Sequence, residues 1–126
     1  MDLSQIKKKI RFLEGQRQAK ITYLLNPKDM VAGSIYTVYK KCGNKNCRCA
    51  RGKPHGPFYY LSRKIDGKTK LTFVRRADEK EIEEKAYNYK KYIKATADLK
   101  KIEKKIYGYL QKIKEIKTED YGNRKV

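Results

Sequence analysis

The segment from Cys42 to His55, CGNKNCRCARGKPH, contains all three cysteines and the only histidine of this 126-residue chain. The four residues are spaced C-x4-C-x-C-x5-H. Three thiolates and one imidazole can form a closed tetrahedral site, and Zn2+ favours such sulfur and nitrogen donors. We therefore predict that a structural Zn2+ ion is bound by Cys42, Cys47, Cys49 and His55.

The residues between the predicted ligands suit a metal site, although other interpretations are open. Nearby basic side chains favour the thiolate form of the cysteines. The backbone can turn tightly around a metal at Gly43, Gly52, Pro54 and Gly56. The C-x-C spacing is less common in structural zinc sites than paired C-x2-C motifs. The alternatives are free cysteines in a basic loop, a disulfide that leaves one thiol unpaired, or an iron–sulfur cluster, which usually takes four thiolates.

Positive charge is concentrated in the centre of the chain. The whole chain has a formal charge of +19, and residues 40–76 contain twelve lysines and arginines against one acid, Asp66, a net +11. Such a field repels a second copy of the chain and attracts polyanions. Nucleic acid is therefore the expected partner.

An amphipathic helix of about 20 residues is expected at the N-terminus, because apolar residues recur at helical spacing between Leu3 and Leu25. Asp2 or Ser4 can cap its start. The dipeptide Asn26-Pro27 ends it.

A second, longer helix is expected to begin at Asp78 and to run for roughly 40 residues. Acidic residues crowd its first turns, where the helix dipole favours them. A break at Thr96–Asp98 or at Gly108 is left open. Because its apolar stripe is longer than a small sheet can cover, we expect either a coiled-coil hairpin with the first helix or a homodimer.

Three strands are expected between the helices, at residues 34–39, 57–65 and 68–74, where β-branched and aromatic side chains are frequent. Asp66-Gly67 is a strong signal for a two-residue hairpin turn. This turn fixes the register, with the expected opposite pairs Ile65–Lys68, Arg63–Lys70, Ser62–Leu71, Leu61–Thr72, Tyr60–Phe73 and Tyr59–Val74.

The expected register assigns the hairpin side chains to two faces. We predict a core face that carries Phe58, Tyr60, Leu71 and Phe73. The opposite face is expected to be exposed and basic, with Arg63, Lys68, Lys70, Tyr59 and Thr72.

These elements predict an α+β fold. A three-stranded antiparallel sheet with a Cys3His metal-stapled loop is expected at residues 33–76. An N-terminal helix and connector precede it at residues 1–32, and the long coiled-coil-like helix and tail follow at residues 77–126. All three parts are expected to belong to a single domain.

The basic face of the sheet is the predicted nucleic-acid contact surface. A two-stranded ribbon fits the major groove of B-DNA, so double-stranded DNA is favoured. With a single strand, exposed tyrosines would instead stack on bases. The expected contact residues are Arg48, Arg51, Lys53, Tyr59, Arg63, Lys68, Lys70, Thr72, Arg75 and Arg76.

The central stretch resembles a prokaryotic family known only as a domain of unknown function. Its members combine C-G-x3-C-x-C-A-x-G with H-G-P-aromatic-aromatic-x-L and a G-K-T hairpin, and the matching segments here are CGNKNCRCARG and HGPFYYLSRKIDGKTK. The similarity covers residues 33–95 and implies that the three cysteines and His55 belong to one recurrent unit. This chain differs in its lysine-rich C-terminal helix, and it has Val-Arg after the hairpin where members often have Val-Pro.

Few residues are available for catalysis, so we expect a binding protein rather than an enzyme. His55 has no second histidine beside it to act as a base, and the phosphate-binding motif GxxxxGK[ST] is absent from the sequence. Four protein ligands also leave a metal no open position for water. Three ligands plus a water would permit metal-dependent hydrolysis.

An alternative function is a protein-interaction or assembly module that works through the coiled-coil helices, with the charge serving solubility. The N-terminus shows no apolar signal segment, and no run is long enough to span a bilayer. We therefore expect a cytoplasmic protein without a membrane partner, associated with the nucleoid if it binds DNA.

Overall fold

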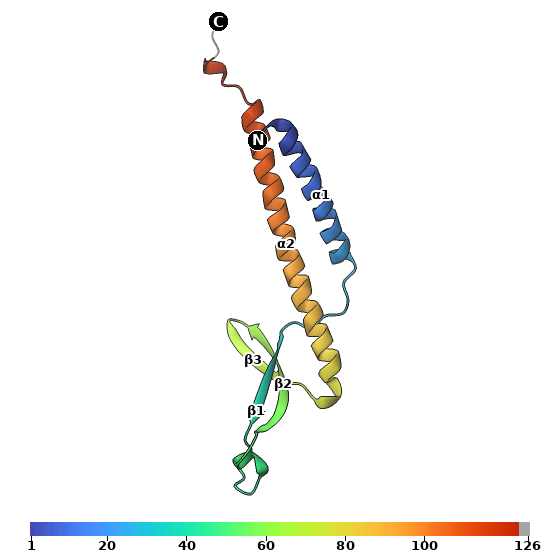
Figure 1. Ribbon diagram of the computed structural model, residues 1–126, viewed down its shortest axis with the longest axis vertical. Coiled ribbons are helices and arrows are strands. Elements are labelled where there is room, and N and C mark those ends of the chain that lie inside the picture. Colours follow the sequence, from blue (N-terminus) through green and yellow to red (C-terminus); the bar gives the residue numbers. More distant parts are fainter. Residues whose placement is uncertain (124–126) are drawn as a thin grey trace. The chain divides into compact units, whose positions relative to one another are not determined.

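In the computed structural model, which describes residues 1–123, the chain forms two compact units. The sheet unit is Lys28–Tyr92, and the helical unit is Met1–Pro27 together with the chain from Ile93 onward. The main elements are α1 (Leu3–Leu25), β1 (Ser34–Lys40), β2 (His55–Ile65), β3 (Lys68–Phe73) and α2 (Glu79–Lys117), shown in Figure 1. Short 3-10 turns occur at Arg48–Ala50 (η1), Arg76–Asp78 (η2) and Tyr121–Asn123 (η3). The predicted α+β class and its element order are confirmed.

The start of α1 is fixed by a capping box. The Asp2 carboxylate accepts a hydrogen bond from the Gln5 backbone N–H at 2.8 Å, and the Gln5 side chain accepts one from the Asp2 N–H at 3.0 Å. Both bonds satisfy backbone donors that have no partner inside the helix. The helix ends at Asn26, before Pro27, which cannot continue it.

Within the helical unit, α1 lies beside the C-terminal part of α2 in antiparallel orientation (Figure 1). Arg17 pairs with Glu103 at 3.5 Å and Lys20 pairs with Asp98 at 3.6 Å, so residue numbers rise along one helix and fall along the other. These exposed ion pairs contribute little stability. The apolar stripe of α1 supplies most of the packing, through the buried side chains Ile6, Ile10 and Leu13.

The long helix α2 is uninterrupted, so neither of the breaks left open by the sequence occurs in it. The line of buried side chains along α2 changes its position on the helix surface where the helix passes from the sheet unit to the helical unit. Ile93 is 50% exposed, whereas Ala95 is buried. The Thr96 hydroxyl donates to the Ile93 carbonyl at 2.7 Å, a local bond that keeps this hydroxyl satisfied within the helix.

The sheet has the order β1-β2-β3, and all of its pairs are antiparallel. Asp66 and Gly67 form the turn with φ values of 51° and 79°, the left-handed conformation that a two-residue hairpin turn requires. The expected β2–β3 register is confirmed from Ile65–Lys68 to Tyr60–Phe73. The Val74 N–H continues it by donating to the Tyr59 carbonyl at 2.8 Å.

The prediction of which sheet face forms the core is wrong. Leu61 and Val74 are buried and pack with Ala86 of α2, and the half-buried residues around them are Val31, Ile35, Tyr59 and Ile82. On the opposite face, Leu71 and Phe73 are 50% and 53% exposed. The first turns of α2 cover the face of Leu61, because the chain leaves β3 through Val74, which points to that face.

The connector between α1 and β1 also packs on the start of α2. The Val31 N–H donates to the Lys85 carbonyl at 3.1 Å, and the Asn88 amide donates to the Asp29 carbonyl at 3.1 Å. Residues 28–33 therefore belong to the sheet unit. Among residues 1–123, no helix is both long and apolar enough to cross a membrane.

Candidate metal centre and basic surface

The candidate metal centre lies in the loop between β1 and β2. The chain leaves β1 at Lys40 and returns at His55, and these two residues are paired across the strands. An irregularity between Val38 and Lys40 interrupts the ladder just before the loop. The strand pair therefore holds His55 beside the loop that supplies the three cysteines.

Gly56 allows the strands to approach closely at this end. Its φ is +136°, and a Cβ atom there would lie 2.9 Å from both the Tyr39 Cδ1 atom and the Val38 carbonyl oxygen. A side chain at this position would clash with β1. Gly56 thus keeps His55, its chain neighbour, close to β1 and the loop.

The four predicted ligand residues lie together. The donor atoms of Cys42, Cys47, Cys49 and His55 are all within 4.8 Å of one another. The Sγ atoms of Cys42 and Cys49 are 3.5 Å apart, and the Cys47 Sγ atom is 3.1 Å from the His55 Nε2 atom. Cys49, on the turn η1, is the most buried of the four at 2% exposure.

The donor distances fit a tetrahedral metal ion. Usual Zn–S and Zn–N bond lengths place two sulfurs about 3.8 Å apart and a sulfur and a nitrogen about 3.6 Å apart in a tetrahedral site. The observed separations of 3.5 and 3.1 Å need only small adjustments to reach these values. The Cys3His group can therefore hold a metal ion, and its chemistry is compatible with zinc.

The thiols of the site differ in acidity. A backbone hydrogen bond from Asn44, followed by contacts with His55 and the other two thiols, lowers the pKa of Cys42 to about 6. The Cys42 N–H, which lies 3.4 Å from the Cys49 Sγ atom, acts to lower the pKa of Cys49. Burial and the neighbouring thiols outweigh that bond, so the pKa of Cys49 is raised. Cys42 thus supplies a thiolate more readily than Cys49 does.

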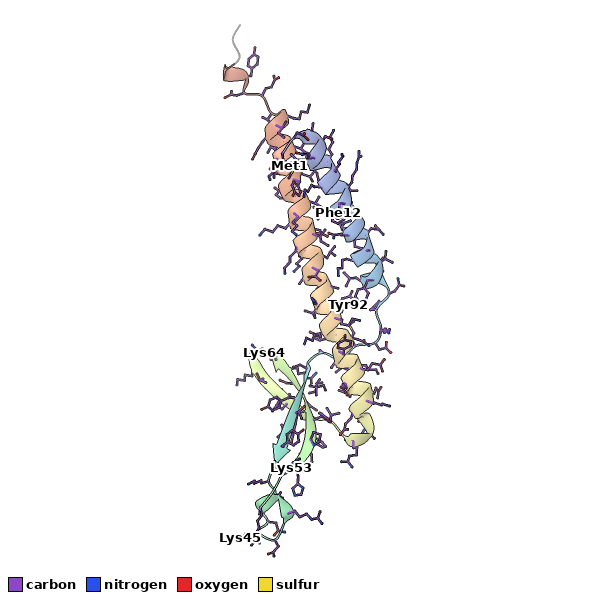
Figure 2. The ribbon with its side chains drawn as sticks, viewed as in Figure 1. Met1, Phe12, Lys45, Lys53, Lys64 and Tyr92 are labelled. Atoms are coloured by element: carbon purple, nitrogen blue, oxygen red, sulfur yellow. The ribbon has the colours of Figure 1, made fainter. Side chains whose placement is uncertain are left out.

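The basic residues expected to contact nucleic acid form two groups within the sheet unit. Arg48, Arg51 and Lys53 lie in the metal loop. The second group, on or after the hairpin strands, is Arg63, Lys68, Lys70, Arg75 and Arg76, together with the neutral Thr72 of β3. All of them are exposed. Figure 2 shows Lys53 at the loop end of the sheet and Lys64, which is not among the expected contact residues, at the hairpin end.

Within the hairpin group, Arg63 and Lys70 are directly opposite each other on β2 and β3. Tyr59 differs from the expectation, because it is half-buried and packs against the Leu61 cluster instead of lying on an exposed face. Its ring contributes to the core of the sheet unit.

The aromatic residues on the face opposite to Leu61 were not among the expected contact residues. Tyr36 is 54% exposed and is paired with Tyr60, which in turn is paired with Phe73. The available signal in the sequence was side-chain alternation along β1, which places Tyr36 on the opposite face from Ile35 and Thr37. This alternation did not identify the exposed face, because both faces of this sheet carry apolar side chains.

Comparison with known proteins gives one match. A protein family described as a domain of unknown function, DUF6788, matches residues 3–84, which include α1, the metal loop, the sheet and the first turns of α2. The match extends further toward the N-terminus than the resemblance inferred from motifs. No curated protein and no solved structure matches the chain. The chain belongs to this family of domains of unknown function.

Proposed function

We propose that this protein binds nucleic acid through its sheet unit and that a structural Zn2+ ion in the Cys3His centre folds that unit. The observation that carries the proposal is the charge of residues 40–76. Twelve basic residues and a single acid give this segment, which lies within the sheet unit, a net charge of +11, and the hairpin and loop arginines and lysines are exposed. Phosphates are the partners that such a surface attracts most strongly.

Zinc is the metal that the donor set supports best. Three soft thiolates and an imidazole select Zn2+ over hard cations such as Mg2+ and Ca2+, which prefer oxygen. Four protein ligands favour a structural role, since no position is left for a reactive water. The role of the ion is then to hold the β1–β2 loop, with Arg48, Arg51 and Lys53, on the sheet.

The test is binding of fluorescently labelled oligonucleotides, measured by anisotropy at several salt concentrations. We expect the logarithm of the affinity to fall linearly with the logarithm of the salt concentration, because phosphate contacts release counterions. The Arg63→Glu/Lys70→Glu double variant should lower the affinity by more than about 10-fold and reduce the salt slope by about 2, one for each lost phosphate contact.

A matched control is Lys104→Glu/Lys105→Glu in the helical unit. It makes the same change in net charge at two exposed lysines that lie outside the sheet unit. We expect a smaller loss of affinity than for the hairpin variant. An equal loss would mean that total charge alone drives binding, and the absence of salt-dependent binding by the unmodified protein would contradict the proposed function.

Assembly through the helices is a second candidate function. It is favoured by large apolar side chains that the helical unit leaves exposed, among them Phe12 at 69%, Tyr107 at 64% and Ile116 at 52%. Under this function, light scattering would give a dimer mass that Phe12→Glu or Tyr107→Glu reduces. The Arg63→Glu/Lys70→Glu variant would leave that mass unchanged.

A further inference from the structure

One face of the sheet is not covered by any other part of the sheet unit. It is opposite to the face that packs on α2, and we call it the open face. Antiparallel pairing and side-chain alternation assign its residues: Ser34, Tyr36, Val38, Lys40, Phe58, Tyr60, Ser62, Lys64, Thr69, Leu71 and Phe73. None of them is acidic and two of them, Lys40 and Lys64, are basic, so the open face is mainly apolar and carries positive charge.

An aromatic row crosses the open face at its centre. Tyr36 of β1 is opposite Tyr60 of β2, and Tyr60 is opposite Phe73 of β3. The ring centroids of Tyr60 and Phe73 are 5.6 Å apart with an interplanar angle of 68°, an edge-to-face contact. Strand spacing makes the row about 10 Å wide. Tyr36 and Phe73 are each more than half exposed, so ring surface at both ends of the row faces solvent.

Cationic groups surround this row. The Lys40 ammonium lies 2.8 Å from the Tyr60 hydroxyl and 5.1 Å from the centre of its ring, which orients that ring. Figure 2 shows Lys64 at the hairpin end of the sheet and Lys45 and Lys53 at the loop end. A chain of phosphates running along the sheet would therefore meet positive charge at both ends and aromatic rings between them.

Unpaired bases are the ligand that combines these two chemistries. A base offers a flat π-surface that stacks on aromatic rings, and its phosphate offers the negative charge that lysines attract. In a duplex the bases stack on each other, so their faces are not available to the protein. An apolar protein partner would match the rings but not the surrounding charge.

We propose that the open face is a stacking platform for an unpaired strand of nucleic acid, with Tyr36, Tyr60 and Phe73 under the bases. This inference rests on the proposed nucleic-acid binding, and it replaces the double-stranded DNA favoured by the sequence with a preference for single strands. Phosphate contacts with the loop lysines and with Lys64 at the hairpin end are open to both single strands and duplexes, whereas the rings contact only unpaired bases.

The test compares three labelled DNA ligands of equal length: a single strand, the same strand in a duplex, and a strand in which abasic residues replace the central nucleotides. The abasic strand keeps the phosphates and removes the stacking surfaces. The unmodified protein should bind the single strand at least about 10-fold more tightly than the abasic strand, as expected for stacking on one or more rings.

The decisive variant is Tyr36→Leu/Phe73→Leu, which keeps an apolar face and the charge but removes two rings. We expect it to bind the single strand about 10-fold or more weakly, and the abasic strand and the duplex as before. Tyr36→Phe/Phe73→Tyr keeps the rings and should restore binding. Tyr87→Leu removes an exposed tyrosine of α2 that also has a lysine over its ring, and it should change nothing.

A fluorescence measurement also tests whether bases stack on the open face, and it keeps an aromatic ring at the substituted position. The chain has no tryptophan, so Phe73→Trp introduces a single reporter on the open face. Its fluorescence should be quenched by the single strand and not by the abasic strand, while a Tyr87→Trp reporter should respond to neither.

The possible failures are distinguishable. If the unmodified protein binds none of the three ligands, the proposed function itself is wrong. If it binds all three equally, or if the leucine variant and the Phe73→Trp reporter show no ring dependence, nucleic-acid binding stands and the stacking platform is overturned. The platform is also overturned if the leucine variant abolishes self-association in the absence of DNA, because the open face would then be a dimer interface.

Discussion

Cys49 is the most deeply buried of the four candidate ligand residues. It is 2% exposed, its sulfur lies 3.5 Å from that of Cys42, and the Cys42 N–H points to it. The other candidate ligands are more exposed to solvent. A change at Cys49 therefore removes one donor of the metal set and also a buried side chain of the loop.

We predict that Cys49→Ser lowers the zinc affinity by more than about 100-fold, because even residues that only support a ligand typically contribute 10- to 100-fold. Competition with a chromogenic chelator measures the affinity, and elemental analysis measures the zinc content per chain. Lys45→Ser, in the same loop but not in the ligand set, should keep one zinc ion per chain. Equal zinc binding by the two variants would contradict the assigned ligand set.

At the scale of elements, the packing of α2 on Leu61 of β2 and on Val74 decides which side chains of the sheet are buried. Leu61 and Leu71 are both leucines on neighbouring strands, but their side chains point to opposite faces. Leu61 is 8% exposed and packs in the cluster with Val74 and Ala86, whereas Leu71 is 50% exposed on the open face. Substitutions of these two leucines therefore compare how much the two faces contribute to stability.

We predict that Leu61→Ala destabilises the protein by about 2–4 kcal/mol, the usual cost of truncating a buried leucine. Leu71→Ala should lower the free energy of unfolding by less than about 1 kcal/mol, because its side chain already contacts water. Urea denaturation followed by circular dichroism measures both values. Equal costs, or a larger cost for Leu71→Ala, would show that the open face is covered in solution.

At the scale of the whole molecule, the charge, the metal ligands and the aromatic row all belong to the sheet unit, whereas the helical unit is held by its own apolar stripe. The sheet unit has a small core, in which Leu61, Val74 and Ala86 are the buried members. A core of that size supplies little stability alone, so a bound metal is expected to contribute much of the folding free energy of this unit.

We predict that chelation of zinc unfolds the metal loop and the sheet and leaves α1 and its packing on α2 largely intact. Structural zinc sites contribute about 10–16 kcal/mol of apparent binding energy, as much as the whole stability of many domains. Hydrogen exchange read by mass spectrometry should show lost protection in residues 34–74 after chelation and retained protection in residues 3–25. Added zinc should restore the protection. Unchanged exchange in residues 34–74 would rule out a metal-dependent fold.

Much of the site could be predicted from sequence, because its determinants are local. The ligand set follows from residue type and spacing over a short loop, and the donor atoms of all four residues are indeed within 4.8 Å of one another. The β2–β3 register follows from the two-residue turn at Asp66-Gly67, since such a turn leaves one alignment of the flanking strands. The cap at Asp2 and the stop at Asn26-Pro27 are likewise local.

Only the tertiary structure decided which face of the sheet is buried. Both faces carry apolar side chains, so alternation alone favoured the larger rings of Tyr60 and Phe73 as core. The direction in which the chain leaves β3 places α2 over Leu61 and Val74 instead, and it leaves the aromatic row in solvent. Local chemistry thus determined the ligands, the turn and the helix ends, while long-range packing decided which side chains are available to a partner.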